Sequence, residues 1–483
     1  MATDSPQVQP GLSARKLFTR HALVTSLAVI TPTGAIFFIT IPMAANAGAA
    51  MPFAFVAAFA TVLLIVNAVM LFAGRVAHAG SFFAFVRLGL GARSGFFAGW
   101  MFLAFYPLVQ VYSLVIFGEF VSTIIQSQAH ANVPWWLLSV AGAVVVWLIS
   151  VLGIRMSIRT DLALLTFEAL VVGALAVTIL AKAHNTVHVI AHSFNPAAAP
   201  LGAGGIAVAV VFGIQAFTGF EAASYLGEEV DNPRRRLPRA ILLSTLLVGV
   251  VFIFFACVGV LGYGPENMAT KYAADAAPWD TLGQMYWHSN FGVLLIDIAA
   301  SVAALAGGMA SQNGAARMLF ALGREGLLPK SLAKTNARLG TPVNALTTLL
   351  VLGVGLTVGL GQAYGPLSAF SLLGLVVTLA ALVVYAIVQV ACVAYFRSAA
   401  DVSVWRKIVF PVLAVAVICY IAYKSIVPLP AAPLSYAIWI ALGWAAAGLV
   451  VVGVLSARGV SFAGLSRAVD DAEPQEIPAE SHA

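Results

Sequence analysis

Apolar stretches long enough to cross a bilayer as helices recur along almost the whole chain. About twenty consecutive apolar residues suffice for one crossing, because a helix rises about 1.5 Å per residue and the hydrocarbon core is about 30 Å thick. Of the 483 residues, 61% are apolar and only 9% are charged, against about 25% charged residues in a soluble domain. We therefore expect an all-α integral membrane protein. The apolar runs predict twelve transmembrane helices, at about 22–43, 51–73, 95–125, 135–154, 161–181, 205–227, 240–262, 290–318, 343–361, 366–395, 408–424 and 435–456.

Basic residues predict the orientation of these spans. If the spans alternate in direction, every Lys and Arg except Lys182, Lys271 and Lys424 falls on one side. Cytoplasmic loops carry the excess of Lys and Arg, so this side is expected to be cytoplasmic, with both termini there. The net charge of +6 is then explained by basic loops facing an anionic leaflet. We expect a multi-pass protein of the cell membrane with no nucleic-acid partner.

The chain is predicted to form one transmembrane domain over residues 21–457. The longest hydrophilic stretches inside it, about 182–204 and 263–289, are each too short for a separate soluble domain. A polar segment, residues 1–20, precedes the domain on the cytoplasmic side. The acidic segment 458–483 follows it, and its composition is typical of a disordered tail.

Two predicted spans contain helix-breaking motifs. The sequence TPTGA at 31–35 interrupts the first span, and FTGFE at 217–221 interrupts the sixth, about 185 residues later. Proline removes a backbone donor and glycine loosens the chain, and unpaired backbone groups in a bilayer are tolerated only where protein buries them or where they line a cavity. Free amides at such a break can bind a carboxylate, and free carbonyls can bind an ammonium. The two breaks together favour a binding site for a small zwitterion over a simple kink.

The order of the spans after each break predicts two structural repeats. Spans one to five would form the first repeat at about 21–182, and spans six to ten the second at about 205–396. Five is an odd number, so the second copy must be inverted in the membrane. Inverted repeats with broken helices are typical of secondary transporters. Helices 11 and 12, at about 408–456, lie outside the duplication.

Three stretches resemble signatures of the amino acid, polyamine and organocation (APC) transporter superfamily. From Gly219, GFEAASYLGEEVDNPRRRLPRAI matches G-F-E followed by E-E-x-x-N-P-x-R-x-x-P. From Arg317, RMLFALGREGLLPKSLAKTNARLGTPVNAL matches R-x-x-F-x-x-x-R-E-G-x-x-P and the T-P after it, and AGSFFAFVRLGLGARSGFFAGW at 79–100 is similar to a third signature. The resemblance implies a LeuT-type fold of five plus five inverted spans with discontinuous helices 1 and 6, followed by helices 11 and 12.

The resemblance also implies which residues bind substrate. The pocket residues would be Thr31, Thr33, Gly34 and Ala35 from the first break and Gln215, Phe217, Thr218 and Gly219 from the sixth span. Phe217 would act as an aromatic lid, or else be an ordinary packed aromatic. Amino-acid-carrying relatives usually have Gly-Ser-Gly where this chain has Thr-Gly-Ala, so one serine contact to a carboxylate is missing. The cargo therefore stays open between amino acids and related small amines.

Ionisable residues inside predicted spans are candidates for coupling, because each costs on the order of 2.5–3.5 kcal/mol to insert. Four stand out in this chain: Glu119, Glu168, Glu221 and Asp297. By resemblance, Glu168 stands where relatives often carry a lysine or glutamate in place of a bound sodium. A buried carboxyl there could take up and release a proton, so Glu168 is the first candidate for proton coupling, with a purely structural role as the alternative.

Other polar residues predict gating. Glu221 follows the second break and is expected to gate or orient the substrate. Glu228 and Glu229 precede three arginines, which predicts an inner-gate ion-pair network that includes Arg235, with a plain positive-inside anchor as the alternative. Ser301 belongs to a small-residue stripe of the eighth span and could hold a cation, although close helix packing explains the stripe as well.

Motifs for enzymatic chemistry are missing from the sequence. It has no GxxxxGK[ST], no HExxH and no nucleophile elbow, so we expect neither an enzyme nor an organic cofactor. His184, His188 and His192 are spaced four apart but lack an acidic or cysteine partner, so no metal site is expected.

These observations predict a proton-coupled permease that imports amino acids or related small amines by alternating access. The alternatives are an exchanger or a sodium-coupled symporter, and, in a different class, a channel or a substrate sensor on the same scaffold. The sequence leaves both monomer and homodimer open.

Overall fold

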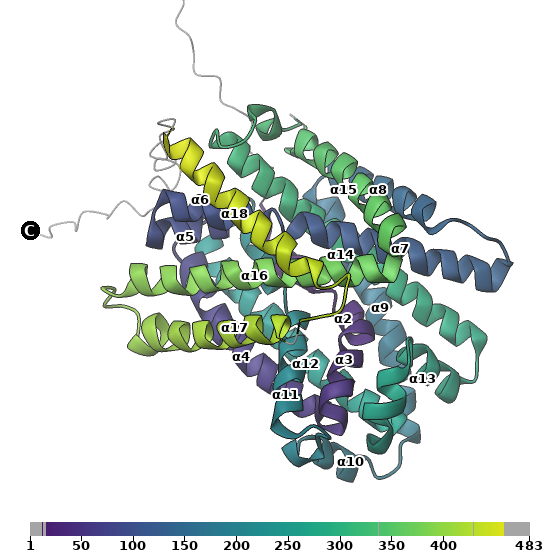
Figure 1. Cartoon of the computed structure of the whole chain (residues 1–483). Helices are drawn as coiled ribbons and strands as arrows, with labels where there is room; N and C mark the ends of the chain where they lie inside the picture. The colour runs from purple at the N-terminus through teal and green to yellow at the C-terminus, as the bar shows by residue number, and fades with distance from the viewer. Residues whose placement is uncertain (1–11, 13–15, 337, 428, 458–483) are drawn as a thin grey trace, which may run out of the picture.

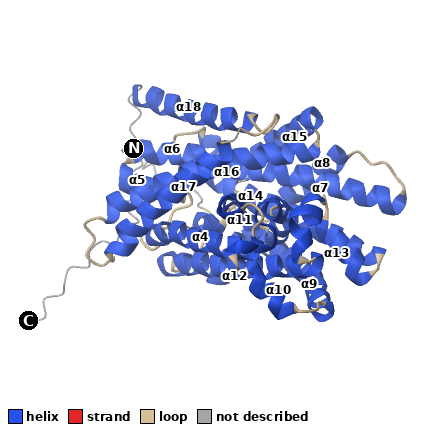
Figure 2. Cartoon of the chain, turned by 60° about the horizontal axis from the view of Figure 1, so that its bottom comes forward, coloured by secondary structure: helices blue, strands red, loops and turns tan. Residues whose placement is uncertain are grey.

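The computed structural model describes residues 12, 16–336, 338–427 and 429–457. This part of the chain is helical and contains no strand, as Figure 2 shows. A single isolated bridge joins Leu17 to Val230 in parallel. The predicted tail, 458–483, and most of the segment 1–20 lie outside the described residues.

The helices follow one another with short connections (Figure 1). In chain order they are α1 (Thr19–Ile30), α2 (Pro32–Phe38), α3 (Thr40–Ala47), η1 (Gly48–Ala50), α4 (Met51–Ala73), α5 (Phe82–Leu90), α6 (Ala92–Phe102), α7 (Tyr106–Ala129), α8 (Trp135–Val151), α9 (Ile154–Lys182), α10 (Thr186–Ser193), η2 (Pro196–Ala198), α11 (Gly202–Ala216), η3 (Phe220–Leu226), α12 (Pro233–Tyr263), η4 (Pro265–Asn267), η5 (Met268–Tyr272), α13 (Pro278–Trp287), α14 (Asn290–Arg324), η6 (Lys330–Ala333), α15 (Val343–Tyr364), α16 (Pro366–Phe396), η7 (Trp405–Val409), α17 (Phe410–Ile426) and α18 (Tyr436–Ala457).

Eleven segments of the described chain are long and apolar enough to cross a membrane. They are α1 with α2, α3 with α4, α6 with α7, α9, α11 with η3, α12, α14, α15, α16, η7 with α17, and α18. The stretch predicted as the fourth span forms α8, which has 17 residues and so lies at the lower limit of about 17–25 residues for a crossing. The described chain therefore has eleven candidate spans, and the twelfth span and the inverted repeat stay predictions.

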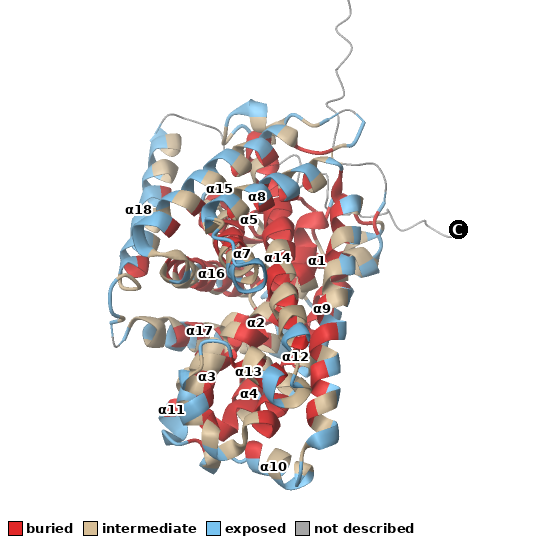
Figure 3. Cartoon of the chain, turned by 90° about the vertical axis from the view of Figure 1, so that its right-hand side faces the viewer, coloured by how far each residue is buried: buried red, intermediate tan, exposed pale blue. Residues whose placement is uncertain are grey.

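The buried core is centred on α14, which has 35 residues. This helix packs against α1, α7 and α9, and buried positions concentrate around it in Figure 3. Small residues allow neighbouring helices to approach closely. At Gly307, an added Cβ would lie 2.3 Å from the Thr31 Cγ2 atom of the first break. The small-residue stripe predicted on this span thus faces the interior, with Ser301 and Gln312 buried.

The outer faces of the spans are apolar and exposed. Leu170 of α9 is 69% exposed, Val351 of α15 is 65% exposed and Trp439 of α18 is 70% exposed. Helix α18, yellow in Figure 1, packs against α6 and α16 at the edge of the bundle. A soluble protein rarely exposes so many large apolar side chains, so these faces are the surface that lipid covers.

Candidate substrate and coupling site

The first span is broken at Thr31, the first residue of the predicted motif. Thr31 has left-handed backbone geometry, with φ 48°, between α1 and α2. Pro32 begins α2, a position where proline is favoured because its missing N–H would be unpaired anyway. Thr33, Gly34 and Ala35 are helical rather than unwound. The first turn of α2 therefore presents N–H groups that have no partner within the helix.

The sixth span is broken between α11 and the 3₁₀ helix η3. Gly219 has φ 111°, a left-handed conformation that strains any residue with a Cβ. An added Cβ at this position would lie 2.7 Å from Val29 Cγ1 and 3.1 Å from the Ile30 backbone nitrogen. The second break therefore lies directly against the end of α1, and the two predicted breaks are in contact.

Ser26 of α1 links the two broken spans. Its hydroxyl donates to the Phe220 carbonyl over 3.0 Å and accepts from the Ala223 N–H, also over 3.0 Å. The side chain is fully buried. The sequence analysis did not select Ser26. The only available signal was a hydroxyl in an apolar span, about one turn before the break.

Predicted pocket residues lie around this contact. Thr33, Ala35 and Phe217 are buried, while Thr31, Gly34, Gln215 and Thr218 are half-buried. The Phe217 ring stacks on Phe59 of α4, with centroids 5.8 Å apart, and meets Phe252 of α12 edge-on at 5.1 Å. In this conformation Phe217 is a packed core aromatic, and its role as a lid stays a prediction.

Glu168 of α9 is a buried carboxyl beside the first break. Its side chain is 1% exposed and lies next to Thr33, but neither carboxylate oxygen is within hydrogen-bonding geometry of any described residue. A buried polar group without a partner costs about 1–3 kcal/mol. Helix α9, which carries Glu168, packs along α1, α2 and α14.

Asp161 is a second buried carboxyl on α9 that the sequence analysis missed. It is 2% exposed, and its Oδ1 atom has no hydrogen-bond partner in the described chain. It precedes Glu168 by seven residues, so both side chains lie on one face of the helix, close enough to interact electrostatically. Its position at the predicted start of the span made Asp161 look like a boundary residue.

Glu221 of η3 is fully buried and hydrogen bonded. Its carboxylate accepts from Tyr385 Oη of α16 at 2.9 Å, from Tyr106 Oη of α7 at 3.4 Å and from the Gly219 N–H at 3.2 Å. These contacts hold the second break against two other spans. The role of Glu221 in gating or orienting the substrate stays a prediction, and its two tyrosine partners could not have been found from sequence spacing.

Two ion pairs join the segment after the second break to the C-terminal part of α14. The Arg317 Nε and Nη2 atoms donate to Glu229 at 2.6 and 3.1 Å, and both side chains are buried. Arg324 donates to both oxygens of Glu228, at 2.9 and 2.7 Å. Burial of Glu228 opposes its charged form, but the hydrogen bonds and charge of Arg324 outweigh burial and lower the pKa of Glu228.

The arginines of this network are not the expected ones. Of the three that follow the glutamates, Arg236 pairs with Asp231 at 2.9 Å, and Arg235 is exposed without an ion pair within 4.0 Å among the described residues. The glutamates pair with α14 instead, because that helix ends beside the segment between η3 and α12. The predicted pairing of the glutamates with the arginines that follow them was wrong, and the role of the ion pairs as an inner gate stays a prediction.

Polar residues at the opposite end of α14 are separate from this network. Ser301 is buried and donates to the Asp297 carbonyl of its own helix at 2.9 Å, which fits helix packing and leaves a cation role as a prediction. The Asp297 side chain lies next to Asp280 of α13, close enough to interact with it electrostatically. Burial, and then the charge of Asp297, raise the pKa of Asp280 to about 8.

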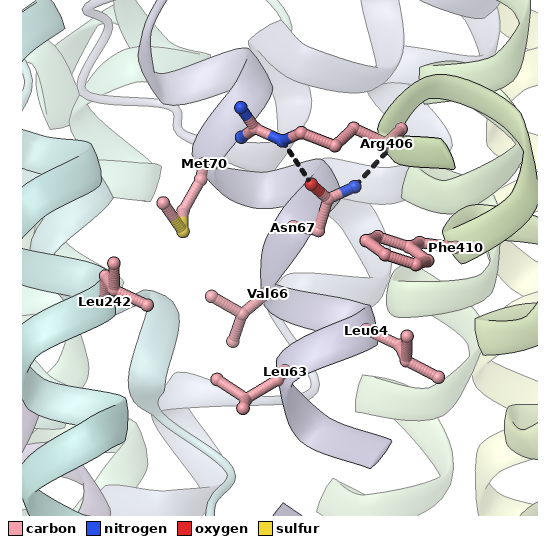
Figure 4. Close-up of a pocket in the computed structure, with 8 residues that line it drawn as sticks. All are labelled: Leu63, Leu64, Val66, Asn67, Met70, Leu242, Arg406 and Phe410. Atoms are coloured by element: carbon pink, nitrogen blue, oxygen red, sulfur yellow. Dashed lines mark hydrogen bonds between the residues drawn. The ribbon is translucent and has the colours of Figure 1, made fainter. Parts of the chain in front are cut away.

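Two cavities lie away from the breaks. One of about 430 Å³ is lined by α4, α12, η7 and the start of α17 (Figure 4). The other, of about 360 Å³, lies between η1, η2 and the segment after α12. The breaks themselves are packed against each other in this conformation.

A multi-pass helical membrane protein with two discontinuous spans in contact has the architecture of a membrane transport protein. The amino acid permease family model matches residues 16–454, nearly the whole chain. The chain therefore belongs to the amino acid permease family of the APC superfamily, as the signature stretches indicated. Its homologues are permeases, and the protein is a transporter rather than an enzyme.

Named relatives carry several kinds of cargo. The branched-chain amino acid permease BcaP of Bacillus subtilis is 28% identical over 68% of this chain and 71% of its own length. The low-affinity putrescine importer PlaP of Escherichia coli K12 is 36% identical over 24% of this chain and 25% of its own. The human large neutral amino acids transporter small subunit 2 is 31% identical over 30% of this chain and 27% of its own.

Proposed function

We propose that this protein is a secondary active permease that imports amino acids or related small amines across the cell membrane by alternating access. The observation that carries the proposal is the contact between the two broken spans, where Gly219 lies against Ile30. Half-helix ends that meet inside a bundle provide free amides and carbonyls for a small charged guest. Membership of the amino acid permease family supports the same class of cargo.

An ammonium group is the feature common to the cargoes named for the relatives. Branched-chain and large neutral amino acids carry it beside a carboxylate, whereas putrescine carries two ammonium groups and no carboxylate. We infer that the carbonyls at the end of α1 receive the ammonium, because a helix C-terminus favours a positive charge. The missing serine at the first break weakens carboxylate recognition, so the cargo range extends to amines.

Coupling to protons is the mode that the buried carboxyls favour. Glu168 lies beside Thr33 at the first break with both oxygens unpartnered, and Asp161 continues the same face of α9. We infer that Glu168 takes up the coupling proton and that Asp161 passes it toward the basic end of the bundle. Sodium coupling and exchange remain the alternatives to test.

The orientation follows from the charges. We place the basic loops, and with them the Glu228 and Glu229 ion pairs, on the cytoplasmic side. The two pairs then form a cytoplasmic gate that must separate when the substrate is released inward. Because Arg317 and Arg324 both belong to α14, movement of η3 away from this helix would break both pairs.

Transport by reconstituted protein tests the proposal. Proteoliposomes loaded with unlabelled leucine or putrescine should accumulate the same labelled compound by counterflow, and an inward proton gradient should drive net uptake without sodium. A channel would dissipate the gradient without counterflow, and a sensor would bind without transport, so either result would overturn the carrier assignment. Uptake that requires sodium at fixed pH would show that sodium, not the proton, is the coupling ion. A thermal-shift screen against amino acids and amines selects the compounds to load.

A further inference from the structure

The cavity of about 430 Å³ is an apolar groove with one cationic end. Its apolar side chains are Leu63, Leu64, Val66, Met70, Leu242 and Phe410, and its polar side chains are Asn67 and Arg406. They come from α4, α12, η7 and the start of α17 (Figure 4). None of these residues belongs to the substrate or coupling site. The volume lies within the range of about 300–1,000 Å³ that is usual for ligand pockets.

Arg406 is held in place by a reciprocal pair of hydrogen bonds with Asn67. Arg406 Nε donates to Asn67 Oδ1 at 3.0 Å, and Asn67 Nδ2 donates to the Arg406 carbonyl at 2.6 Å. Asn67 is 8% exposed, so its amide is committed to this contact. Figure 4 shows the Nε atom of Arg406 directed toward Asn67 and the terminal nitrogens directed away from it.

The terminal N–H groups of Arg406 remain available to donate hydrogen bonds to another acceptor. No carboxylate lies within 4.0 Å of Arg406 in the described chain, and Asp401, five residues earlier, pairs with Arg75 instead. A guanidinium oriented through Nε presents two N–H groups in the plane that matches a phosphate. The contact with Asn67 therefore orients the Arg406 guanidinium to bind a phosphate group.

The position of Arg406 fits the headgroup level of a bilayer. Its neighbour Trp405 is 64% exposed, and tryptophan is enriched at membrane interfaces. Arg239 of α12 is exposed and precedes Leu242 by three residues, so both lie on one face of that helix. Arg406 is the charged residue that lines the groove, and Arg239 lies outside this lining.

We propose that this groove is a binding site for an anionic phospholipid. The phosphate binds Arg406, and an acyl chain lies along Leu63 and Phe410. Basic pockets between transmembrane helices are sites for anionic lipid headgroups. The occupant is a lipid rather than a free phosphate, because six of the eight lining residues are apolar. Such a lipid joins α17 to α4 and α12 without entering the transport pathway.

Native mass spectrometry tests this site independently of transport. Purified full-length protein is incubated with equimolar palmitoyl-oleoyl phosphatidylglycerol and phosphatidylcholine. The unmodified protein should retain phosphatidylglycerol about fivefold more than phosphatidylcholine, the ratio expected for one surface arginine. Arg406→Gln should bring the ratio close to one. Arg93→Gln, which removes an exposed arginine of α6 outside the groove, should leave the ratio unchanged. An unchanged ratio in Arg406→Gln overturns the proposal.

Two further measurements distinguish lipid binding in the groove from attraction to a single surface charge. Leu63→Trp fills the apolar part and should reduce retention of both lipids at least threefold, while thermal unfolding in detergent confirms that the variant is folded. Glycerol 1-phosphate carries the headgroup without the acyl chains and should displace no lipid at millimolar concentration. Displacement by glycerol 1-phosphate, or full lipid retention by folded Leu63→Trp, would show that only a phosphate contact exists and would reject the lipid site.

Discussion

Arg317 of α14 and Glu229, which follows η3, form a buried two-pronged ion pair with donor–acceptor distances of 2.6 and 3.1 Å. The pair joins the segment after the second break to the longest helix of the bundle. Arg317 also donates through Nη1 to the Asn313 carbonyl at 3.0 Å. A buried charge pair of this kind tolerates the loss of neither partner, because the remaining charge is then unpaired.

Glu229→Gln should therefore destabilise the protein strongly. Breaking a buried ion pair by removing one partner costs about 3–5 kcal/mol, so thermal unfolding in detergent should begin many degrees lower. Arg235→Gln is the matched control, because this exposed arginine has no ion pair in the described chain; it should change stability by less than about 0.5 kcal/mol. Equal shifts in the two variants would contradict the role of the pair.

Gly219→Ala should separate the two breaks. The added Cβ meets Val29 Cγ1 at 2.7 Å in a backbone conformation with φ 111°, and forced overpacking costs about 1–3 kcal/mol. We expect the variant to lose the thermal stabilisation that substrate confers on the unmodified protein. Gly204→Ala lies in α11 with no atom within 4 Å of its added Cβ and should retain that response. Retention by Gly219→Ala as well would show that the breaks do not form the substrate site.

Tyr385→Phe should lower the stability of the folded protein more than Tyr106→Phe does. Tyr385 donates to Glu221 at 2.9 Å, whereas the bond from Tyr106 is longer, at 3.4 Å. Leaving part of a buried carboxylate without a partner costs about 1–3 kcal/mol. Thermal unfolding of the two variants, which differ from the parent by the same hydroxyl, measures the difference. The reverse order would mean that Tyr106 is the principal partner of Glu221.

Glu168→Gln should uncouple transport from protons. The amide cannot release a proton, so uptake driven by a pH gradient should fall at least tenfold while counterflow of the same substrate continues. Asp161→Asn should slow gradient-driven uptake and also leave counterflow intact. Reconstituted vesicles measure both activities in one preparation. Unchanged gradient-driven accumulation by Glu168→Gln would remove this residue from the coupling step.

Stability should fall as the pH rises through the titration of Asp280. Its pKa is raised from 3.8 to about 8, first by burial and then by the charge of Asp297. Between these values the folded state binds the proton more tightly than the unfolded state, so the contribution is complete below pH 3.8 and is lost as the pH rises through about 8. The slope for one proton is at most about 1.4 kcal/mol per pH unit.

Asp280→Asn should flatten this pH dependence. Thermal unfolding midpoints between pH 5 and 9 measure it, and Glu266→Gln, which changes an exposed carboxylate between α12 and α13, should leave the parent slope intact. If Asp280→Asn keeps the parent slope, another group is responsible for the pH dependence.

Local sequence signals located the breaks but not their partners. Pro32 and Gly219 mark where the first and sixth spans are interrupted, because each acts on its own backbone. The partners of Glu221 come from α7 and α16, far along the chain, so no spacing in the sequence could have identified them. Asp161 was also missed, because a charge at the predicted end of a span does not by itself indicate burial.

The sequence by itself determined that the chain is a helical membrane protein, where most of its spans lie, and that two of them are broken. These properties depend on hydropathy and on the backbone preferences of single residues. Only the tertiary structure decided which charges pair. Glu229 binds Arg317 rather than the nearby Arg235 because helix packing, not distance along the chain, determines which side chains meet in a low-dielectric interior.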